Sequence, residues 1–188
     1  MRRVFFRPKE FSRAEAKDLV MSIVVCGIDP GLARTGYAVL RVEGGNHSIL
    51  EAGVFRLNDD DPLEERLVPL DHDVTAILTE HGPTVVAVEE LYSHYKHPKT
   101  AVLMGHARGV ILLAAAKLGL RIQSYSPTQI KRFVTGNGLA TKLQIQQAIQ
   151  KVFHLPALPE PPDVADALAI AFCCGNDESR REMAESPR

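Results

Sequence analysis

Apolar and polar positions alternate along the first third of the chain as they do in β-strands. Residues 23–28 form a continuous apolar run, which is typical of a strand buried on both faces. Residues 36–40 and 49–55 predict two further strands, joined by a Gly-Gly-Asn hairpin turn at 44–46. Three strands linked this closely predict an antiparallel meander.

Helical spacing dominates the rest of the chain, interrupted by two short apolar runs. A helix is predicted from the acidic start at Asp59 to the Gly82-Pro83 stop. Thr141 and Gln144 have the spacing of a capping box. The remaining predicted elements are strands over 84–88 and 122–125 and helices over 100–118, 127–133, 141–153 and 163–174. Small residues at the centre of the helix over 100–118 suggest close packing against another backbone.

This order of elements predicts one mixed α/β domain over residues 22–175. The strand over 84–88 follows a helix, so it should lie parallel to the strand over 23–28 through a right-handed crossover. Residues 176–188 are charged and are predicted to be a mobile tail.

Residues 1–21 form an N-terminal extension with several interpretations. The segment is rich in Lys and Arg and lacks the apolar centre of a signal peptide. It suits a short amphipathic helix, a mobile basic arm, or a misassigned start, because Met21 is itself a natural beginning. These alternatives remain open.

Composition narrows the class of protein only moderately. At 188 residues, 45% apolar and 24% charged, the chain suits a single globular domain. Three cysteines without a CxxC pattern argue against a disulfide framework or a zinc site, and reduced thiols fit a cytoplasmic protein. No run approaches the length of a membrane span, so no membrane partner is expected. The net charge of −1 does not mark a nucleic-acid binder, and beyond residue 20 acidic residues outnumber basic ones.

Carboxylates stand at the ends of two predicted strands and at the start of the last predicted helix. Asp29 ends the strand over 23–28 and Glu89 follows the strand over 84–88, so parallel pairing brings both to one edge of the sheet. Asp163 and Asp166 share one helical face because they are three residues apart. Four converging acids would repel one another unless cations neutralised them. Oxygen ligands without a His/Cys cluster suit Mg²⁺ or Mn²⁺.

Each of these acids also has a purely structural interpretation. Asp29 suits a turn before Pro-Gly, and Asp163 suits the first turn of a helix, where the dipole favours an acid. Glu89 gains little structurally at the end of a strand. The coincidence of acids at three element ends favours a metal cluster.

Four motifs, in order, resemble those of the RuvC family of crossover (Holliday) junction endonucleases. The motifs are Gly27–Gly31 with Thr35–Tyr37, Ala87–Glu89, Gly105–Val110 and Asp163–Ala171. They extend over nearly the whole chain beyond the N-terminal extension. The resemblance implies a ribonuclease H-like fold, with a five-stranded mixed sheet of three antiparallel strands and two parallel ones, flanked by helices.

The same resemblance implies a function. Members are homodimers that resolve four-way DNA junctions by paired symmetric nicks during recombination and repair, beside the RuvA–RuvB branch-migration complex. They leave 5′-phosphate and 3′-hydroxyl ends and use Mg²⁺ or Mn²⁺, here taken as two ions per site. By motif, the metal ligands and catalytic carboxylates are Asp29, Glu89, Asp163 and Asp166.

Basic and aromatic positions around these motifs are further candidates. Lys142 matches the family's active-site lysine, although alone it would suit a solvated helix start. Tyr92 matches an aromatic position that stacks on an unpaired base, or it is a tyrosine half-buried at a strand end. The candidate phosphate contacts, each of which alone is equally an ordinary surface charge, are Lys96, His97, Lys99, Arg108, Lys131 and Arg132.

Three other functions compete with this one. An actin/Hsp70-type ATPase or sugar kinase shares the Asp-x-Gly turn but needs a second such motif and a second domain. A related ribonuclease H-like nuclease would act on other branched nucleic acids. A non-catalytic junction-binding protein would have no need of all four acids. Cleavage of defined DNA substrates discriminates among them.

Overall fold

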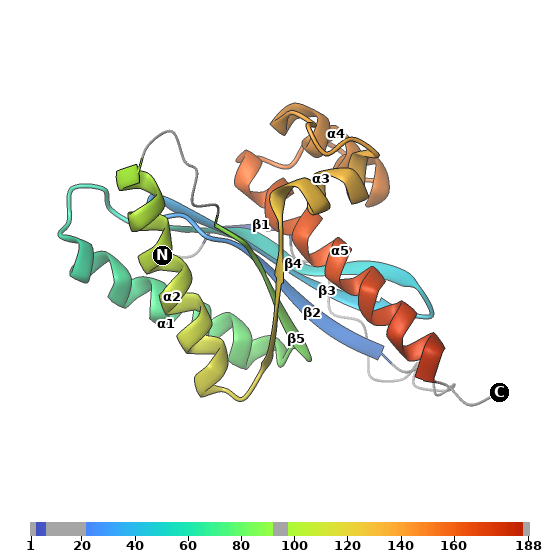
Figure 1. Ribbon diagram of the computed structural model, residues 1–188, viewed down its shortest axis with the longest axis horizontal. Coiled ribbons are helices and arrows are strands. Elements are labelled where there is room, and N and C mark those ends of the chain that lie inside the picture. The colour runs from blue at the N-terminus through green and yellow to red at the C-terminus, as the bar shows by residue number, and fades with distance from the viewer. Residues whose placement is uncertain (1–2, 7–21, 92–97, 186–188) are drawn as a thin grey trace.

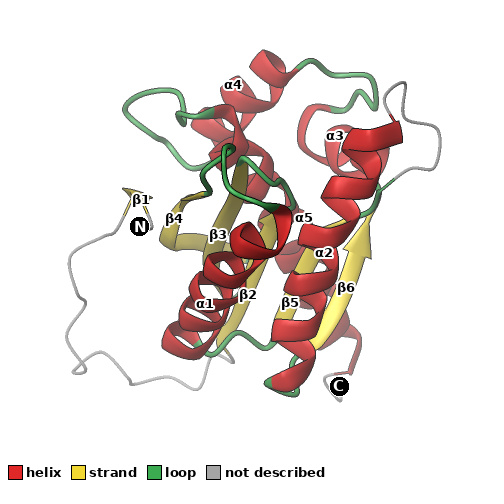
Figure 2. Ribbon diagram, turned by 90° about the vertical axis from the view of Figure 1, so that its left-hand side faces the viewer, coloured by secondary structure: helices red, strands yellow, loops and turns green. Residues whose placement is uncertain are grey.

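The protein is a mixed α/β domain in which one sheet separates two layers of helices (Figure 1). The computed structural model describes residues 3–6, 22–91 and 98–185. Helices α1 and α2 cover one face of the sheet, while α3, α4 and α5 lie on the other (Figures 1 and 2).

The sheet has the strand order β1-β4-β3-β2-β5-β6. Five of the strands are β2 (Ser22–Asp29), β3 (Arg34–Glu43), β4 (Asn46–Arg56), β5 (Val85–Glu89) and β6 (Arg121–Tyr125). Strands β2, β3 and β4 form an antiparallel meander, and β5 and β6 continue the sheet in parallel. The predicted mixed sheet is therefore confirmed.

A sixth strand, β1 (Arg3–Phe6), pairs antiparallel with β4 at the edge of the sheet. None of the interpretations of the N-terminal extension included a strand. Pairing with the exposed edge of β4 supplies partners that local sequence does not reveal. Residues 7–21 lie outside the described part of the chain.

The helices are α1 (Leu63–His81), α2 (Pro98–Lys117), α3 (Pro127–Thr135), α4 (Lys142–Val152) and α5 (Pro162–Glu185). The predicted capping box at the start of α4 is present. The backbone N–H of Gln144 donates to Thr141 Oγ1 at 3.3 Å, and that of Thr141 donates to Gln144 Oε1 at 2.8 Å.

The prediction of a mobile tail over 176–188 is wrong for residues 176–185, which continue α5. Glu178 is buried and accepts hydrogen bonds from Arg121 of β6 and, at 3.2 Å, from Arg181. Asp177 accepts a hydrogen bond from the Tyr125 hydroxyl at 3.0 Å. Arg121 and Tyr125 lie on β6, far away in sequence, so these contacts cannot be recognised from the charged segment alone.

Close packing of α5 on the sheet positions everything that follows. A Cβ on Gly27 of β2 would lie 2.4 Å from the backbone nitrogen of Ala171, and one on Gly36 of β3 would lie 2.1 Å from the carbonyl oxygen of Asp163. The N-terminal turns of α5 therefore rest directly on the backbones of β2 and β3. The three cysteines are free and buried, Cys173 and Cys174 in the core under α5 and Cys26 in the core on the opposite face of the sheet.

Candidate metal centre

The end of β2 and the start of α5 bring the predicted carboxylates together. Residues 28 and 88 are paired in the parallel register of β2 and β5, so Asp29 and Glu89 occupy the same edge of the sheet. Side chains alternate along a strand, and both acids share the face on which Val25, Ala87 and α5 pack. Asp163 and Asp166, on the first two turns of α5, lie close enough to Asp29 for their negative charges to raise its pKa.

The turn after Asp29 is fixed from both sides. The backbone N–H of Gly31 donates to Thr35 Oγ1 at 3.2 Å. Arg66 of α1 donates to the carbonyl oxygen of Leu32 at 2.8 Å and to Asp59 Oδ1 at 2.6 Å. These bonds hold the end of β2, and with it the Asp29 carboxylate, in one place.

Burial and neighbouring acids disfavour the charged form of three of these carboxyl groups. Burial, followed by the charges of Glu89 and Asp166, raises the pKa of Asp29 well above its ordinary value. Burial and the charge of Asp166 raise the pKa of Glu89 to about 7. Burial also raises the pKa of Asp166, although the neighbouring Lys142 partly offsets the shift.

This donor set fits a hard divalent cation. The four side chains offer only carboxylate oxygens, the ligands that Mg²⁺ and Mn²⁺ prefer. A bound cation would also relieve the repulsion that helps to raise the pKa values of Asp29, Glu89 and Asp166. Among the described residues, the group whose ligand atoms all lie within 4.8 Å of one another is Glu51, Glu80 and His81, not the carboxylates at the end of β2. Glu51 there already binds the Tyr37 hydroxyl at 2.9 Å and His81 Nε2 at 3.2 Å, so that group is better explained as a buried hydrogen-bond network.

Two lysines from the α3–α4 layer face the cluster. Lys142, the first residue of α4, places its Nζ 3.1 Å from Asp166 Oδ2. Burial works to lower the pKa of Lys142, but the negative charges of Asp166, Asp163 and Asp29 raise it on balance, so the ammonium stays charged. Lys131 of α3, predicted as a phosphate contact, lies near enough to lower the pKa of both Glu89 and Asp166.

Of the other residues predicted to contact DNA, one is hydrogen-bonded within the fold, one is exposed and the rest lie outside the described residues. Arg108 is occupied inside the fold, because its Nε donates to the Glu89 carbonyl at 3.1 Å and its guanidinium donates to Ser124 Oγ at 2.8 Å. It thereby ties α2 to the ends of β5 and β6. Arg132 is exposed on α3. Tyr92, Lys96, His97 and the side chain of Lys99 lie outside the described residues.

Sequence reasoning missed one cation of the site. Arg34, the first residue of β3, pairs with Asp163 at 3.7 Å from its Nε. The register of β3 against β2 and the contact between Gly36 and α5 place it there. Since both are long-range features, no local motif identifies Arg34. The only sequence signal was its place beside Thr35 and Gly36 in the first motif.

Without divalent metal, the protein is expected to lose stability as pH rises from about 5 to about 8. The Glu89 carboxyl, with its pKa raised from 4.5 to about 7, binds its proton more tightly in the folded state than in the unfolded one. Its contribution to stability is therefore complete below the unfolded pKa and is lost as pH rises through the folded pKa. A shift of this size is worth about 3 kcal/mol.

Thermal unfolding in EDTA across this pH range measures the effect, with Glu89→Gln as the matched variant. The parent's melting temperature should fall toward pH 8 by on the order of 5–10 °C more than that of the variant. Mg²⁺ or Mn²⁺ should restore more stability at the upper end of the range than at the lower. If the melting temperatures of parent and variant fell equally with rising pH, the electrostatic account of the cluster would be refuted.

The comparisons with known proteins agree with this arrangement. The family model described as crossover junction endodeoxyribonuclease RuvC matches residues 25–174. A crossover junction endodeoxyribonuclease RuvC from Rhodopirellula baltica is 48% identical over 149 residues, which cover 79% of this chain and 84% of the relative. Its counterpart from Ruminiclostridium cellulolyticum is 42% identical over 154 residues, or 82% of this chain and 92% of the relative.

A solved structure is also similar. The structure of Thermus thermophilus RuvC in complex with a Holliday junction substrate superposes with a TM-score of 0.78 at 32% identity. It covers 85% of this chain and 96% of that one. The family match over residues 25–174 includes the edge of the sheet that carries the carboxylates.

Proposed function

The chain belongs to the RuvC family of crossover junction endodeoxyribonucleases, and from that premise we propose that it resolves four-way DNA junctions by nicking two opposed strands. The observation that carries the proposal is the convergence of Asp29, Glu89, Asp163 and Asp166 at one end of the sheet, where burial and mutual repulsion raise the pKa values of three of them. The reaction is hydrolysis of the bond between phosphorus and the 3′ oxygen, leaving 5′-phosphate and 3′-hydroxyl ends.

In this proposal the four carboxylates hold Mg²⁺ or Mn²⁺, two ions per site. Bound divalent ions supply an activated water and stabilise the leaving oxygen. The sheet fixes Asp29 and Glu89, while α5 fixes Asp163 and Asp166, so the ligands come from two rigid elements packed in contact. Lys142 and Lys131 direct positive charge at the position where negative charge develops on the phosphate.

A nicking assay tests the substrate. In Mg²⁺ or Mn²⁺ the protein is expected to cut a synthetic four-way junction at paired symmetric positions, and to leave a linear duplex of the same sequence uncut. Equal cutting of both DNAs would overturn the assignment. Cutting of three-way or flap DNA in preference to the junction would favour the broader ribonuclease H-like nuclease, and binding without cutting would favour a junction-binding protein.

We further propose that two copies associate through α2. One side of this helix packs on the sheet through Ala107, Ile111 and Ala114, but Val102 and Leu113 are 60% and 52% exposed. By length and composition alone the stretch 100–117 is apolar enough to cross a membrane, contrary to the expectation from the sequence, and 22% of it is buried.

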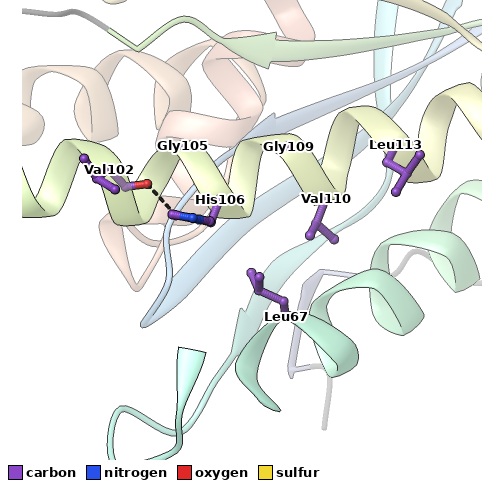
Figure 3. A pocket seen from close by; sticks show the side chains of 7 residues that line it. All are labelled: Leu67, Val102, Gly105, His106, Gly109, Val110 and Leu113. Atoms are coloured by element: carbon purple, nitrogen blue, oxygen red, sulfur yellow. Dashed lines mark hydrogen bonds between the residues drawn. The ribbon is translucent and has the colours of Figure 1, made fainter. Parts of the chain in front are cut away.

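A groove between α1 and α2 marks the uncovered side (Figure 3). It has a volume of about 440 Å³ and its lining is mostly apolar. The groove is lined by Leu67, Val102, Gly105, His106, Gly109, Val110 and Leu113. The sequence suggested that the small residues of α2 pack against another backbone. A Cβ on Gly105 or Gly109 would meet nothing within 4 Å, so within the described chain these two glycines make no such contact. Close approach of the same helix from a second copy would use them, in an isologous interface that matches the two-fold symmetry of a junction.

Leu113→Glu is expected to weaken self-association by about 30-fold or more, because a charge would replace an apolar anchor at the centre of the interface. Sedimentation equilibrium measures the change. Leu139→Glu is the control, since Leu139 is 88% exposed in the α3–α4 connection. A parent that is monomeric at micromolar concentration, or equal effects of both changes, would refute this interface.

The remaining expectations rest on family membership. We propose that the protein acts beside the RuvA–RuvB branch-migration complex during recombination and repair. Its DNA substrate and its three free buried cysteines fit the cytoplasm. We also propose the division into an extension over 1–21, a nuclease domain that begins at residue 22 and includes α5 to its end at Glu185, and a short C-terminal segment after it.

A further inference from the structure

Two arginines stand side by side at the open end of the β3–β4 pair. Arg34 and Arg56 are directly opposite each other in the antiparallel register, as the terminal pair of the ladder. Both are exposed. Val54, two residues before Arg56 on β4, packs in the core beneath α5, so alternation turns the Arg56 side chain to that same face. The ion pair with Asp163 shows that Arg34 also points to the α5 face.

This pairing is unfavourable unless an anion lies nearby. Like charges directly opposite on antiparallel strands destabilise a sheet. Arg34 has one acidic partner, Asp163, at 3.7 Å and remains 47% exposed. Within the described part of the chain Arg56 takes part in no ion pair. With one carboxylate paired to Arg34 and, among the described residues, none paired to Arg56, positive charge is in excess on this side of the acidic cluster.

The two arginines lie on the opposite side of the cluster from Lys131. In the sheet order, β3 and β4 are on one side of β2, which carries Asp29, and β5, which carries Glu89, is on the other. The charge of Lys131 acts on Glu89 and Asp166, whereas Arg34 contacts Asp163. The carboxylates are therefore flanked by positive charge on both sides.

Resting on the proposed function, we propose that Arg34 and Arg56 form a second phosphate-binding site, which grips the DNA backbone next to the phosphate that is cut. The arginine fork matches the geometry of phosphate oxygens and binds them in bidentate fashion. Asp163 lies 3.7 Å from the Nε of Arg34 and positions this side chain, which is 47% exposed and therefore open to a phosphate with or without metal.

Junction binding in EDTA tests the site, because cleavage plays no part in it. The variant Arg34→Gln/Arg56→Gln is expected to bind a labelled four-way junction about 10-fold more weakly at moderate salt. The slope of log Kd against log salt concentration should fall by about 2, since about 0.9 of slope is lost for each phosphate contact.

Three controls keep the test specific. Arg41→Gln removes one positive charge from β3 at the far end of the strand, where Arg41 pairs with Glu43 at 3.7 Å, and it should leave the slope unchanged. Arg34→Lys/Arg56→Lys keeps the charges and should restore the slope. Melting temperatures of all variants establish that they are folded.

The outcomes separate this site from the function itself. If the glutamine variant binds with the parent's slope, or if Arg41→Gln lowers the slope as much, the phosphate site is refuted although the parent still cuts junctions. If the parent cuts linear duplex as readily as junctions, the proposed function fails, and the slopes still decide whether the arginines contact phosphate.

Discussion

Replacing Asp29 by asparagine is expected to lower the rate of junction cleavage by about 10³-fold or more while leaving junction binding and the fold intact. The change is nearly isosteric, but it removes a charged ligand at the centre of the cluster, and metal-assisted stabilisation of the transition state is worth several kcal/mol. The same change should raise the melting temperature in EDTA near pH 8. Asp29 is the carboxylate whose pKa is raised by burial and by three acidic neighbours, so removing its charge relieves repulsion.

Single-turnover cleavage, junction binding and thermal unfolding together measure these effects. Asp60→Asn is the control, because it makes the same chemical change at an exposed residue in the loop before α1. A variant that cuts at the parent's rate would remove Asp29 from the catalytic centre. A variant that loses activity and melts at a lower temperature would show that Asp29 supports the fold instead.

The variant Gly27→Ala is expected to destabilise the protein by about 3 kcal/mol, because the added Cβ would lie 2.4 Å from the Ala171 nitrogen and 2.6 Å from the Ala167 carbonyl oxygen. Both contacts are with backbone, so relief requires α5 to move away from β2. That movement would displace Asp163 and Asp166 from Asp29, and cleavage should fall along with stability.

Gly105→Ala gives the matched comparison for this substitution. A Cβ at position 105 meets nothing within 4 Å in its own chain, and alanine favours a helix over glycine, so the stability of the monomer should be unchanged or slightly higher. Urea unfolding of both variants measures the difference. Equal free energies of unfolding would contradict the close packing of α5 on the sheet.

The sequence was sufficient to predict the features that rest on short-range pattern. Apolar runs and turn residues identify β2 to β6, and the rule that parallel strands end together brings Asp29 to Glu89. The spacing of Asp163 and Asp166 similarly follows from helical periodicity. The structure brings these predicted residues together, and their catalytic role stays a prediction.

The features that were missed depend on contacts between distant segments. Strand β1 exists through pairing with β4, and the last turns of α5 are held by Arg121 and Tyr125 of β6. Arg108 looked like a free surface charge because its hydrogen-bond partners, the Glu89 carbonyl and Ser124, belong to other elements. Arg34 acquires its place beside Asp163 from strand register. Periodicity contains none of this information.

The most direct test of the metal centre is anomalous diffraction from crystals grown with Mn²⁺. The account predicts manganese peaks in contact with the carboxylate of Asp29 and shared with Glu89, Asp163 and Asp166, and their loss from crystals of Asp29→Asn. Manganese bound at Glu51 and His81, or absent from the end of β2 at saturating concentration, would contradict it.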